Sequence, residues 1–293
     1  MDSQAKRALV TVVIQTVGRQ SLVRAVKSIV NQSILKNGRG ARVDVWIGVD
    51  IDRFGTLTNV RAEIDAMAAS IPGFTVFWLD IGYTTSLRGP GVHNNLFGGS
   101  LRTVLTFLAK SRWVAYLDDD DWWHPTHLEL LVNAIQGNKW AWSMCWFTDG
   151  TTEKTLGVDI LESAGPGRGV YAKSFGGFVR PSALMIDKLA CMPLLHLWSI
   201  SPLKTGGGQD RAIFHGLREM PEVGATQTPT VYYAMDPNDT NHEIRMKLLK
   251  QVNPNLEDVK LQRTDSVREE LAKEGERLGL VDNQFFVLKN QKK

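Results

Sequence analysis

The amino-acid sequence predicts an α/β protein with a Rossmann-like, mostly parallel central sheet flanked by helices. Two observations support this class: short apolar, β-branched segments alternate with amphipathic ones, and 293 residues are enough for one large domain. A third is that three apolar segments end in polar residues, namely Thr16, Asp50 and Asp118. In such sheets ligands bind beyond the carboxyl ends of the strands, so we expect these residues to share one pocket.

The first 121 residues carry the clearest alternation of strands and helices. β-Branched and apolar residues dominate the expected strands, whereas the expected helices repeat apolar residues every three or four positions. The segment 82–99 is rich in Gly, Pro and Asn, and we expect it to be a loop. We expect strands at 8–16, 43–50, 75–79 and 113–117, and helices from after Gly18 to Val30, at 60–69 and at 101–108.

The pattern is less regular after residue 121. Thr126 and Glu129 have the spacing of a capping box for a helix that runs to Ile135. Residues 150–169 form a polar, Gly-rich stretch that predicts a mobile loop. We further expect strands at 140–147, 182–186 and 228–234, a helix from near Gln209, and an amphipathic helix at 266–278.

Composition and charge limit the classes of function that the protein can have. The net charge of +3, without a dense Lys/Arg patch interleaved with aromatic residues, argues against nucleic-acid binding. Two cysteines cannot build a disulfide framework, which favours a reduced, cytoplasmic setting. Residues 1–8 lack the apolar core of a signal peptide, and no apolar run is long enough to span a bilayer. Peripheral association with the inner face of the membrane stays open.

Four consecutive aspartates, 118–121, follow the apolar strand expected at 113–117. Four like charges repel one another unless a cation holds them, and hard divalent ions favour carboxylate oxygens. A solvated acidic turn is the alternative interpretation. The position between a buried strand and a helix start, beside Trp122 and Trp123, favours a cation site.

Several motifs occur in an order typical of one enzyme family. The segment 10–33 contains a strand, the pair Gly18-Arg19 and a helix that ends in Asn-Gln. The strand VWIGVD ends at Asp50, AYLDDDDWWHPTHLE covers 115–129, and Gly-Gln-Asp occupies 208–210. Together these motifs, over roughly residues 8–240, resemble a family 2 glycosyltransferase with the GT-A fold.

The resemblance implies roles for individual residues. Asp118 and Asp120 would hold a divalent metal ion, Mn or Mg, that bridges the donor diphosphate. Thr16 and Asp50 would contact the nucleobase and ribose, and Arg102 would contact the diphosphate or the donor-site carboxylates. The resemblance also implies that Asp118 contacts the donor. Asp119 and Asp121 would orient donor hydroxyls or cap the next helix.

Asp210 is the candidate catalytic base, because it occupies the position of the acid that the family places in its Gly-Glu-Asp motif. The alternative is a helix N-cap. Gln209 stands where the family usually has a second acid, and Gln15 where it commonly has Pro, so the pocket departs from the usual pattern. Further candidates for the site are Arg19, Asp121, Trp122, Gln209, Asp236 and His242.

The resemblance therefore predicts a metal-dependent, inverting glycosyltransferase. It would move a sugar from a nucleotide-sugar donor, UDP-linked by preference, to a hydroxyl of a glycan or glycolipid acceptor. Two alternatives stay open: a nucleotidyltransferase on a similar sheet, and a non-catalytic module that binds a nucleotide or cation. We expect a glycosyltransferase domain at 1–245, with a donor half at 8–121 and an acceptor half at 122–245, and an extension at 246–293.

Overall fold

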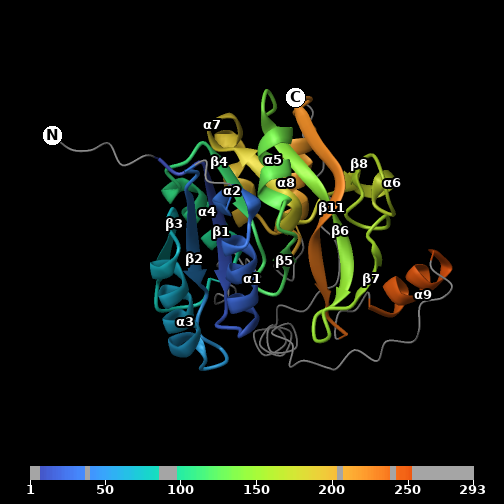
Figure 1. Ribbon diagram of the computed structural model, residues 1–293. Coiled ribbons are helices and arrows are strands. Elements are labelled where there is room, and N and C mark those ends of the chain that lie inside the picture. Colours follow the sequence, from blue (N-terminus) through green and yellow to red (C-terminus); the bar gives the residue numbers. More distant parts are fainter. Residues whose placement is uncertain (1–6, 37–39, 86–97, 203–206, 238–241, 253–293) are drawn as a thin grey trace.

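The computed structural model describes residues 7–36, 40–85, 98–202, 207–237 and 242–252. These residues form a mixed nine-stranded sheet with helices packed on both of its faces (Figure 1). The strand order is β3-β2-β1-β4-β10-β6-β11-β5, and β7 pairs with β6 beside this path. The predicted α/β class, with a helix-flanked central sheet, is confirmed.

The first half of the sheet is parallel, as the alternating sequence pattern predicts. β1 lies between β2 and β4, and β3 forms the edge next to β2. Parallel neighbours need a crossover connection, and helices provide the crossovers here. The strands are β1 (Val10–Thr16), β2 (Val43–Val49), β3 (Phe74–Asp80) and β4 (Trp113–Tyr116), and the helices are α1 (Ser21–Val30), α2 (Ser33–Lys36), α3 (Leu57–Ser70) and α4 (Gly99–Leu108).

The second half of the sheet is mixed. β10 runs antiparallel to both β4 and β6, whereas β11 is parallel to β6. β11 starts before the predicted strand, and its register shifts at Pro229, which has no N–H to continue the ladder. The strands are β5 (Trp122–Trp123), β6 (Trp140–Asp149), β7 (Thr155–Val158), β10 (Leu184–Asp187) and β11 (Val223–Met235).

The remaining elements are short, apart from three helices. A two-stranded sheet, separate from the central one, joins β8 (Gly165–Pro166) and β9 (Gly177–Phe178). The helical elements are α5 (His127–Ile135), α6 (Ala172–Phe175), η1 (Pro181–Ala183), α7 (Lys188–Cys191), η2 (Met192–Ser199), α8 (Gln209–Arg218) and α9 (His242–Val252). The amphipathic helix expected at 266–278 lies outside the described residues, as does most of the loop expected at 82–99.

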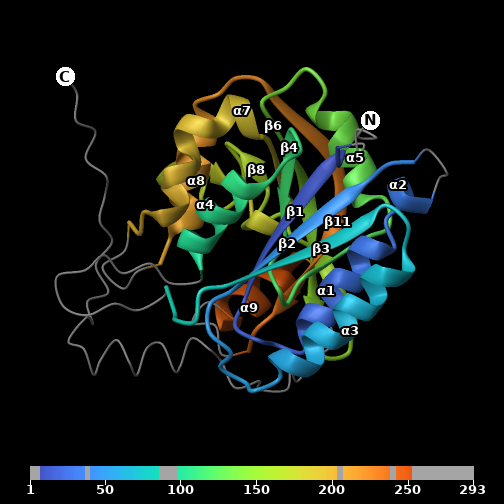
Figure 2. The same cartoon turned by 90° about the vertical axis from the view of Figure 1, so that its left-hand side faces the viewer.

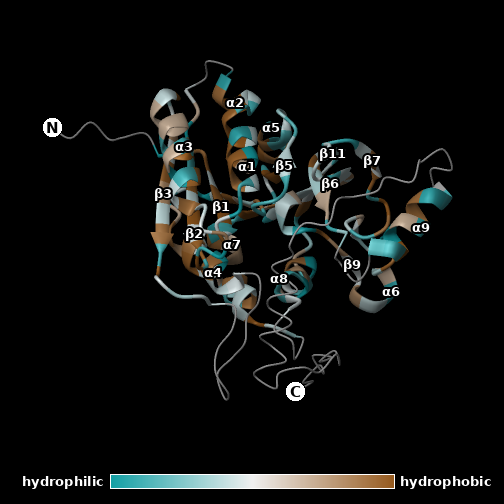
Figure 3. Ribbon diagram, turned by 90° about the horizontal axis from the view of Figure 1, so that it is seen from below, coloured by the Kyte–Doolittle hydropathy of each residue, from teal (hydrophilic) through white to brown (hydrophobic). Residues whose placement is uncertain are grey.

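The helices form two layers around the twisted sheet (Figure 2). α1, α3 and α5 lie on one side, and α4, α7 and α8 lie on the other. Figure 3 shows hydrophobic residues on the strands enclosed between the helices, whereas hydrophilic residues gather on outer surfaces. Among the described residues, no helix is both long and apolar enough to cross a membrane.

The stretch 150–169, expected to be a mobile loop, is largely irregular but contains two short strands. The stretch contains β7 and β8, and it is held by the buried carboxylate of Asp159, which accepts three backbone N–H groups at 2.7–3.1 Å. Arg180 pairs with both Asp159 and Glu162, and Arg245 of α9 lies 2.8 Å from Glu162. Buried charges are stable only when paired in this way. Because these partners are distant in sequence, composition alone suggested a loop.

The expected capping box at the start of α5 is also wrong. Thr126 occupies the N-cap position, but its side chain makes no capping hydrogen bond and instead meets His124 at 2.9 Å. Glu129 accepts a 2.5 Å hydrogen bond from Ser33. Thr126 and Glu129 therefore form hydrogen bonds with other side chains and not those of the capping box. The amide of Leu128 is satisfied by the side chain of Gln32 at 2.8 Å.

A buried histidine makes the stability of the fold depend on pH. His127 stacks on Trp123, with ring centroids 4.3 Å apart, and its Nδ1 meets the Thr230 hydroxyl at 2.7 Å. Burial, with a smaller contribution from His124, lowers the pKa of His127 from 6.5 to about 3. The unfolded chain therefore takes up this proton from pH 6.5 downward, whereas the folded protein does not.

On acidification from pH 7 to 5, we expect the free energy of unfolding to fall by about 2 kcal/mol more than in His127→Gln, with a slope that approaches about 1.4 kcal/mol per pH unit well below pH 6.5. Urea unfolding of both proteins between pH 7 and 5 measures this difference. His215→Gln, which changes an exposed histidine of α8, is the control and should keep the wild-type slope. Equal slopes for wild type and His127→Gln would contradict this assignment.

Candidate active site

The register between β1 and β4 determines where the first residues of the site lie. These strands pair in parallel, and the same offset of 103 residues continues beyond their ends into side-chain hydrogen bonds. Gln15 Nε2 donates to Asp118 Oδ1 at 3.0 Å, and Thr16 Oγ1 donates to Asp119 Oδ2 at 2.7 Å. The strand register therefore sets the positions of the first two aspartates, and it brings Thr16 to them as the sequence predicts.

Two arginines form ion pairs with three of the aspartates. Arg19 Nη1 lies 3.2 Å from Asp119 Oδ1 and 2.5 Å from Asp120 Oδ2. Arg102 comes from the buried face of α4 and pairs with Asp118. Arg19, a minor candidate in the sequence, is thus central to the site, and the predicted proximity of Arg102 to the aspartates is present.

Asp121 differs from its three neighbours because the protein uses both of its oxygens. It is 1% exposed and accepts hydrogen bonds from Ser182 Oγ at 2.6 Å and the Ala234 amide at 2.9 Å. The amide of Asp118 donates to the same serine oxygen at 3.1 Å. Burial, reinforced by Asp120 and Asp118, raises the pKa of Asp121 well above its usual value. We call Asp118–Asp121 the acidic turn. The hydrogen bonds of Asp121 link this turn to β11 and to η1. The expected cap of the next helix is not formed.

Asp120 is the aspartate that reaches solvent. Its side chain is 41% exposed, and its carbonyl oxygen accepts a hydrogen bond from Arg24 at 3.0 Å. Loss of surrounding water raises the pKa of Asp120 to about 6, Arg19 opposes this rise, and Asp119 and Asp118 add to it. A carboxylate in this setting gains from a further cation, because it is crowded by like charges.

Arg24 is a site residue that sequence reasoning missed. Its guanidinium lies 3.9 Å from the ring centroid of Trp122 and also donates to the Gly150 carbonyl at 2.7 Å. Trp122 is 9% exposed and stacks on Tyr232. Trp122, a further site candidate in the sequence, thus has Arg24 over its ring and Tyr232 stacked on it. The position of Arg24 on α1, one turn after Arg19, was the only signal for it in the sequence.

Asp50 ends β2 as predicted, and it holds the chain after β3. The Thr84 hydroxyl donates to its carboxylate at 3.1 Å, and so does the Thr85 amide. Beside it, Gly18 adopts φ +85°, and a β-carbon there would lie 2.2 Å from Asp52 Oδ1. Only glycine permits this close approach of the β1–α1 turn.

Asp210 lies in the first turn of α8. Gly208, at φ +83°, is the N-cap, so the N-cap interpretation of Asp210 is wrong. The carboxylate accepts the Arg211 amide at 2.8 Å, and Gln209 beside it is buried. The described residues show no hydrogen bond or ion pair between Asp210 and the four aspartates. η2 packs on both α8 and α4, so it links Asp210 to the helix of Arg102.

The last two candidates lie after β11. Burial alone would lower the pKa of Arg19, but Asp119, Asp120 and, more weakly, Asp236 raise it above its usual value. Asp236 therefore lies on the Arg19 side of the site. His242 is the first residue of α9, and its predicted role remains a prediction.

The donor set suits a divalent cation shared with a substrate. Asp118 and Asp120 each use one oxygen for an arginine, which leaves a second oxygen on each carboxylate. No cluster of three or more His, Cys, Asp or Glu side chains able to hold a metal occurs among the described residues. Mg²⁺ commonly takes one or two carboxylates together with substrate phosphates, so two aspartates fit that mode.

The fold is similar to that of solved S. aureus TarS structures. The crystal structure of TarS has a TM-score of 0.50 and 12% identity, and the match covers 94% of this chain and 44% of TarS. TarS 1–349 in complex with UDP-GlcNAc has a TM-score of 0.52 and 13% identity, over 85% of this chain and 68% of that one. The chain thus spans less than half of full-length TarS. At these identities the likeness shows the fold, which is that of GT-A glycosyltransferases.

A family match covers the acidic turn. Residues 92–159, which include Arg102 and all four aspartates, match the model described as Glycosyl transferase family 2. This part of the chain is therefore similar to glycosyl transferase family 2, the family that its motifs resemble, and the whole fold is similar to that of GT-A glycosyltransferases. No curated protein is similar enough in sequence to count as a relative.

Ser182→Ala tests the link between the acidic turn and the rest of the fold. The substitution removes a donor to buried Asp121 and the acceptor of the Asp118 amide, so we expect a loss of about 1–3 kcal/mol in the free energy of unfolding. Urea unfolding measures the loss. Ser70→Ala removes the hydrogen bond of an exposed serine to Met67 and serves as the control. Equal effects of the two substitutions would contradict the role assigned to Ser182.

Proposed function

We propose that this protein is a family 2 glycosyltransferase that moves a sugar from a nucleotide-sugar donor to a hydroxyl of a glycan or glycolipid, with inversion and with a divalent metal ion. The acidic turn carries the proposal. Asp118 and Asp120 are held next to Arg19 and Arg102 at the carboxyl end of a parallel sheet, where such folds bind nucleotides.

The donor half is proposed to bind the nucleotide at the ends of β1 and β2. Thr16 and Asp50 would contact the nucleobase and ribose, and Asp119 would hold Thr16 and Arg19 in place for the donor. Arg102 would meet the diphosphate. The solved TarS complexes with UDP and with UDP-GlcNAc support a UDP-linked donor, because that fold accommodates these nucleotides. We also propose the division into 8–121 for donor, 122–245 for acceptor, and 246–293 as an extension.

Asp118 and Asp120 are proposed to hold the metal ion, Mn or Mg. When bound, the ion supplies Lewis-acid stabilisation of the negative charge that develops on the leaving diphosphate. Arg19 places a guanidinium against Asp120 and so occupies part of the space over this carboxylate. Diphosphate binding would give Arg19 an anionic partner other than Asp119 and Asp120, and it would free the Asp120 carboxylate for the ion.

Asp210 is proposed as the base that takes the proton from the acceptor hydroxyl. A single base is enough for one direct displacement at the anomeric carbon, and one displacement inverts the configuration there. The helix start places the carboxylate on an element that packs through η2 against α4. The acceptor would then approach from the side of α8, across from the nucleotide.

Removal of either carboxylate tests the reaction. We expect Asp120→Ala and Asp210→Ala to lower the transfer or hydrolysis of UDP-sugars with Mn²⁺ by about 100-fold or more, because each removes a group that acts on the reacting centre. A panel of UDP-sugars with product detection by mass spectrometry measures this. Asp210→Ala should retain UDP binding, whereas Asp120→Ala should lose the Mn²⁺ dependence of that binding.

Glu63→Ala, which changes an exposed acid on α3, is the matched control and should turn over like wild type. Equal turnover in all four proteins would refute the site assignment. Failure of the wild type to bind either UDP or Mn²⁺ would instead favour a structural role for the acidic turn. Treatment of the wild type with EDTA should abolish transfer, and added Mn²⁺ should restore it.

Arg19→Gln tests whether this arginine competes with the metal ion. The substitution removes the positive charge next to Asp119 and Asp120, so Mn²⁺ should bind the nucleotide-free protein more tightly, on the order of tenfold. Titration with detection of free Mn²⁺ by electron paramagnetic resonance measures the affinity. Arg61→Gln, which removes an exposed arginine paired with Asp65, should leave the affinity unchanged. An unchanged or weaker affinity in Arg19→Gln would overturn the competition.

A further inference from the structure

An exposed apolar surface lies on the side of the molecule that carries α4 and α7. Val104, Phe107 and Leu108 of α4 are 46%, 51% and 41% exposed, and Leu189 and Met192 of the α7–η2 segment are 66% and 41% exposed. We call these five residues the α4–α7 surface. Large apolar side chains exposed together in this way mark interaction sites on soluble folds.

Two contacts join the parts of this surface. Lys188, the first residue of α7, donates a hydrogen bond to the carbonyl of Ala109, directly after α4. Thr103 Oγ1 donates to the Leu195 carbonyl of η2 at 3.1 Å. α4 and the α7–η2 segment therefore lie side by side, so their exposed apolar residues belong to one face.

The exposed residues form one stripe of α4. Val104, Phe107 and Leu108 follow helical spacing, whereas Leu101, Arg102 and Leu105 occupy the buried face. Packing against η2 and the sheet needs only the buried face. Among the described residues, the side chains of the outer stripe stay 41–51% exposed.

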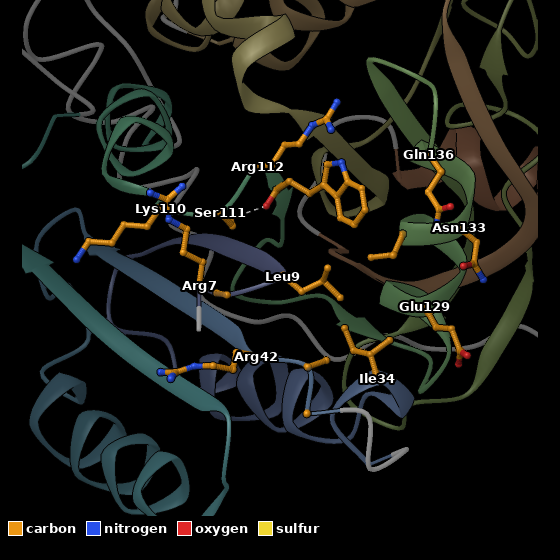
Figure 4. Close-up of a pocket in the computed structure, with 15 residues that line it drawn as sticks. Arg7, Leu9, Ile34, Arg42, Lys110, Ser111, Arg112, Glu129, Asn133 and Gln136 are labelled. Atoms are coloured by element: carbon orange, nitrogen blue, oxygen red, sulfur yellow. Dashed lines mark hydrogen bonds between the residues drawn. The ribbon is translucent and has the colours of Figure 1, made fainter. Parts of the chain in front are cut away.

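Basic residues border the α4–α7 surface. Lys110 and Arg112 follow α4 directly, and with Arg7 and Arg42 they line a groove of about 750 Å³ at the amino ends of the strands (Figure 4). Figure 4 shows the side chains of Arg7, Lys110 and Arg112 projecting around the opening of this groove. Leu9, 36% exposed, adds an apolar side chain within it.

The acids near these basic residues leave a net positive border. Asp187 is buried, pairs with Arg112 at 2.6 Å and also caps α7. Burial raises the pKa of Asp44, and Arg42 and Lys110 oppose this rise. Glu129 lies at the far end of the groove and bonds to Ser33. Among the described residues, neither Lys110 nor Arg7 forms an ion pair within 4.0 Å, although Lys110 lies close enough to influence Asp44.

Apolar side chains next to exposed lysines and arginines are the combination that binds the surface of an anionic bilayer. The apolar groups enter the headgroup region, and each basic residue near the surface contributes about 1 kcal/mol by attraction to anionic lipid. A protein partner would also have to be strongly acidic around an apolar centre. The charge complementarity therefore favours a membrane.

We propose that the α4–α7 surface, with the basic border at Arg7, Lys110 and Arg112, docks the protein on a membrane that contains anionic lipid. The docking does not depend on the proposed reaction, because it needs neither donor nor metal.

Sedimentation with vesicles, without any nucleotide, tests the docking. The full-length protein is mixed with phosphatidylcholine vesicles that contain 0 or 30% phosphatidylglycerol, a composition chosen to carry a strong surface charge. We expect binding to the anionic vesicles only, weakened by salt. F107S with L189S, and Arg7→Glu with Lys110→Glu, should each lower the partition coefficient by about tenfold or more.

Matched variants change equally exposed residues elsewhere. V170S with I244S is the control for the apolar pair, and Arg61→Glu with Lys247→Glu is the control for the charge pair. Both should bind vesicles like wild type, and thermal unfolding checks that all variants fold. No binding of wild type to anionic vesicles, or equal binding of surface and control variants, overturns the proposal. Loss of a dimer in F107S/L189S without vesicle binding would assign the surface to a second copy and overturn it as well.

UDP-sugar hydrolysis in the absence of vesicles separates the two proposals. The surface variants should keep the hydrolysis rate of wild type, because none of their substituted residues contacts the acidic turn. Loss of vesicle binding with unchanged hydrolysis therefore supports docking alone. Vesicle binding by a wild type that lacks hydrolysis would support docking and refute the proposed reaction.

Discussion

The mutual repulsion of four adjacent carboxylates is the constraint on which the rest of this structure depends. The protein reduces this repulsion in two ways. Arg19 and Arg102 form ion pairs with Asp118, Asp119 and Asp120. Asp121 is buried with its pKa raised, so it need not carry a full charge, and it serves as a hydrogen-bonded tie instead. What remains is a solvent-facing carboxylate, at Asp120, with capacity for one more cation.

The register of a parallel sheet converts this local chemistry into a defined site. Because β1 and β4 keep one offset, Gln15 and Thr16 meet Asp118 and Asp119 just beyond the strand ends. The carboxylates directly follow β4, whereas Arg19 comes from the turn between β1 and α1, and Arg102 comes from helix α4. A diphosphate could therefore exchange partners with Arg19 without any movement of the strands.

Much of the fold could be predicted from the sequence, because periodic burial leaves a strong local pattern. The strands and helices of the first 121 residues agree with it to within a few positions. The predictions failed where a partner distant in sequence decides the outcome. Asp159 and Arg180 hold the stretch 150–169, and Ser33 takes Glu129 away from its capping box. No local pattern contains such partners.

The sequence by itself determined the class of fold and the edge of the sheet at which the acids gather. Those features follow from residue spacing and from the polarity of strand ends, which the chain carries locally. Only the tertiary structure decided which contacts each of the four aspartates makes. Whether an aspartate faces solvent or ties β11 to the turn depends on Arg19, Ser182 and Ala234. These residues reach the turn only when the chain is folded, since they lie about 60–115 residues away along it.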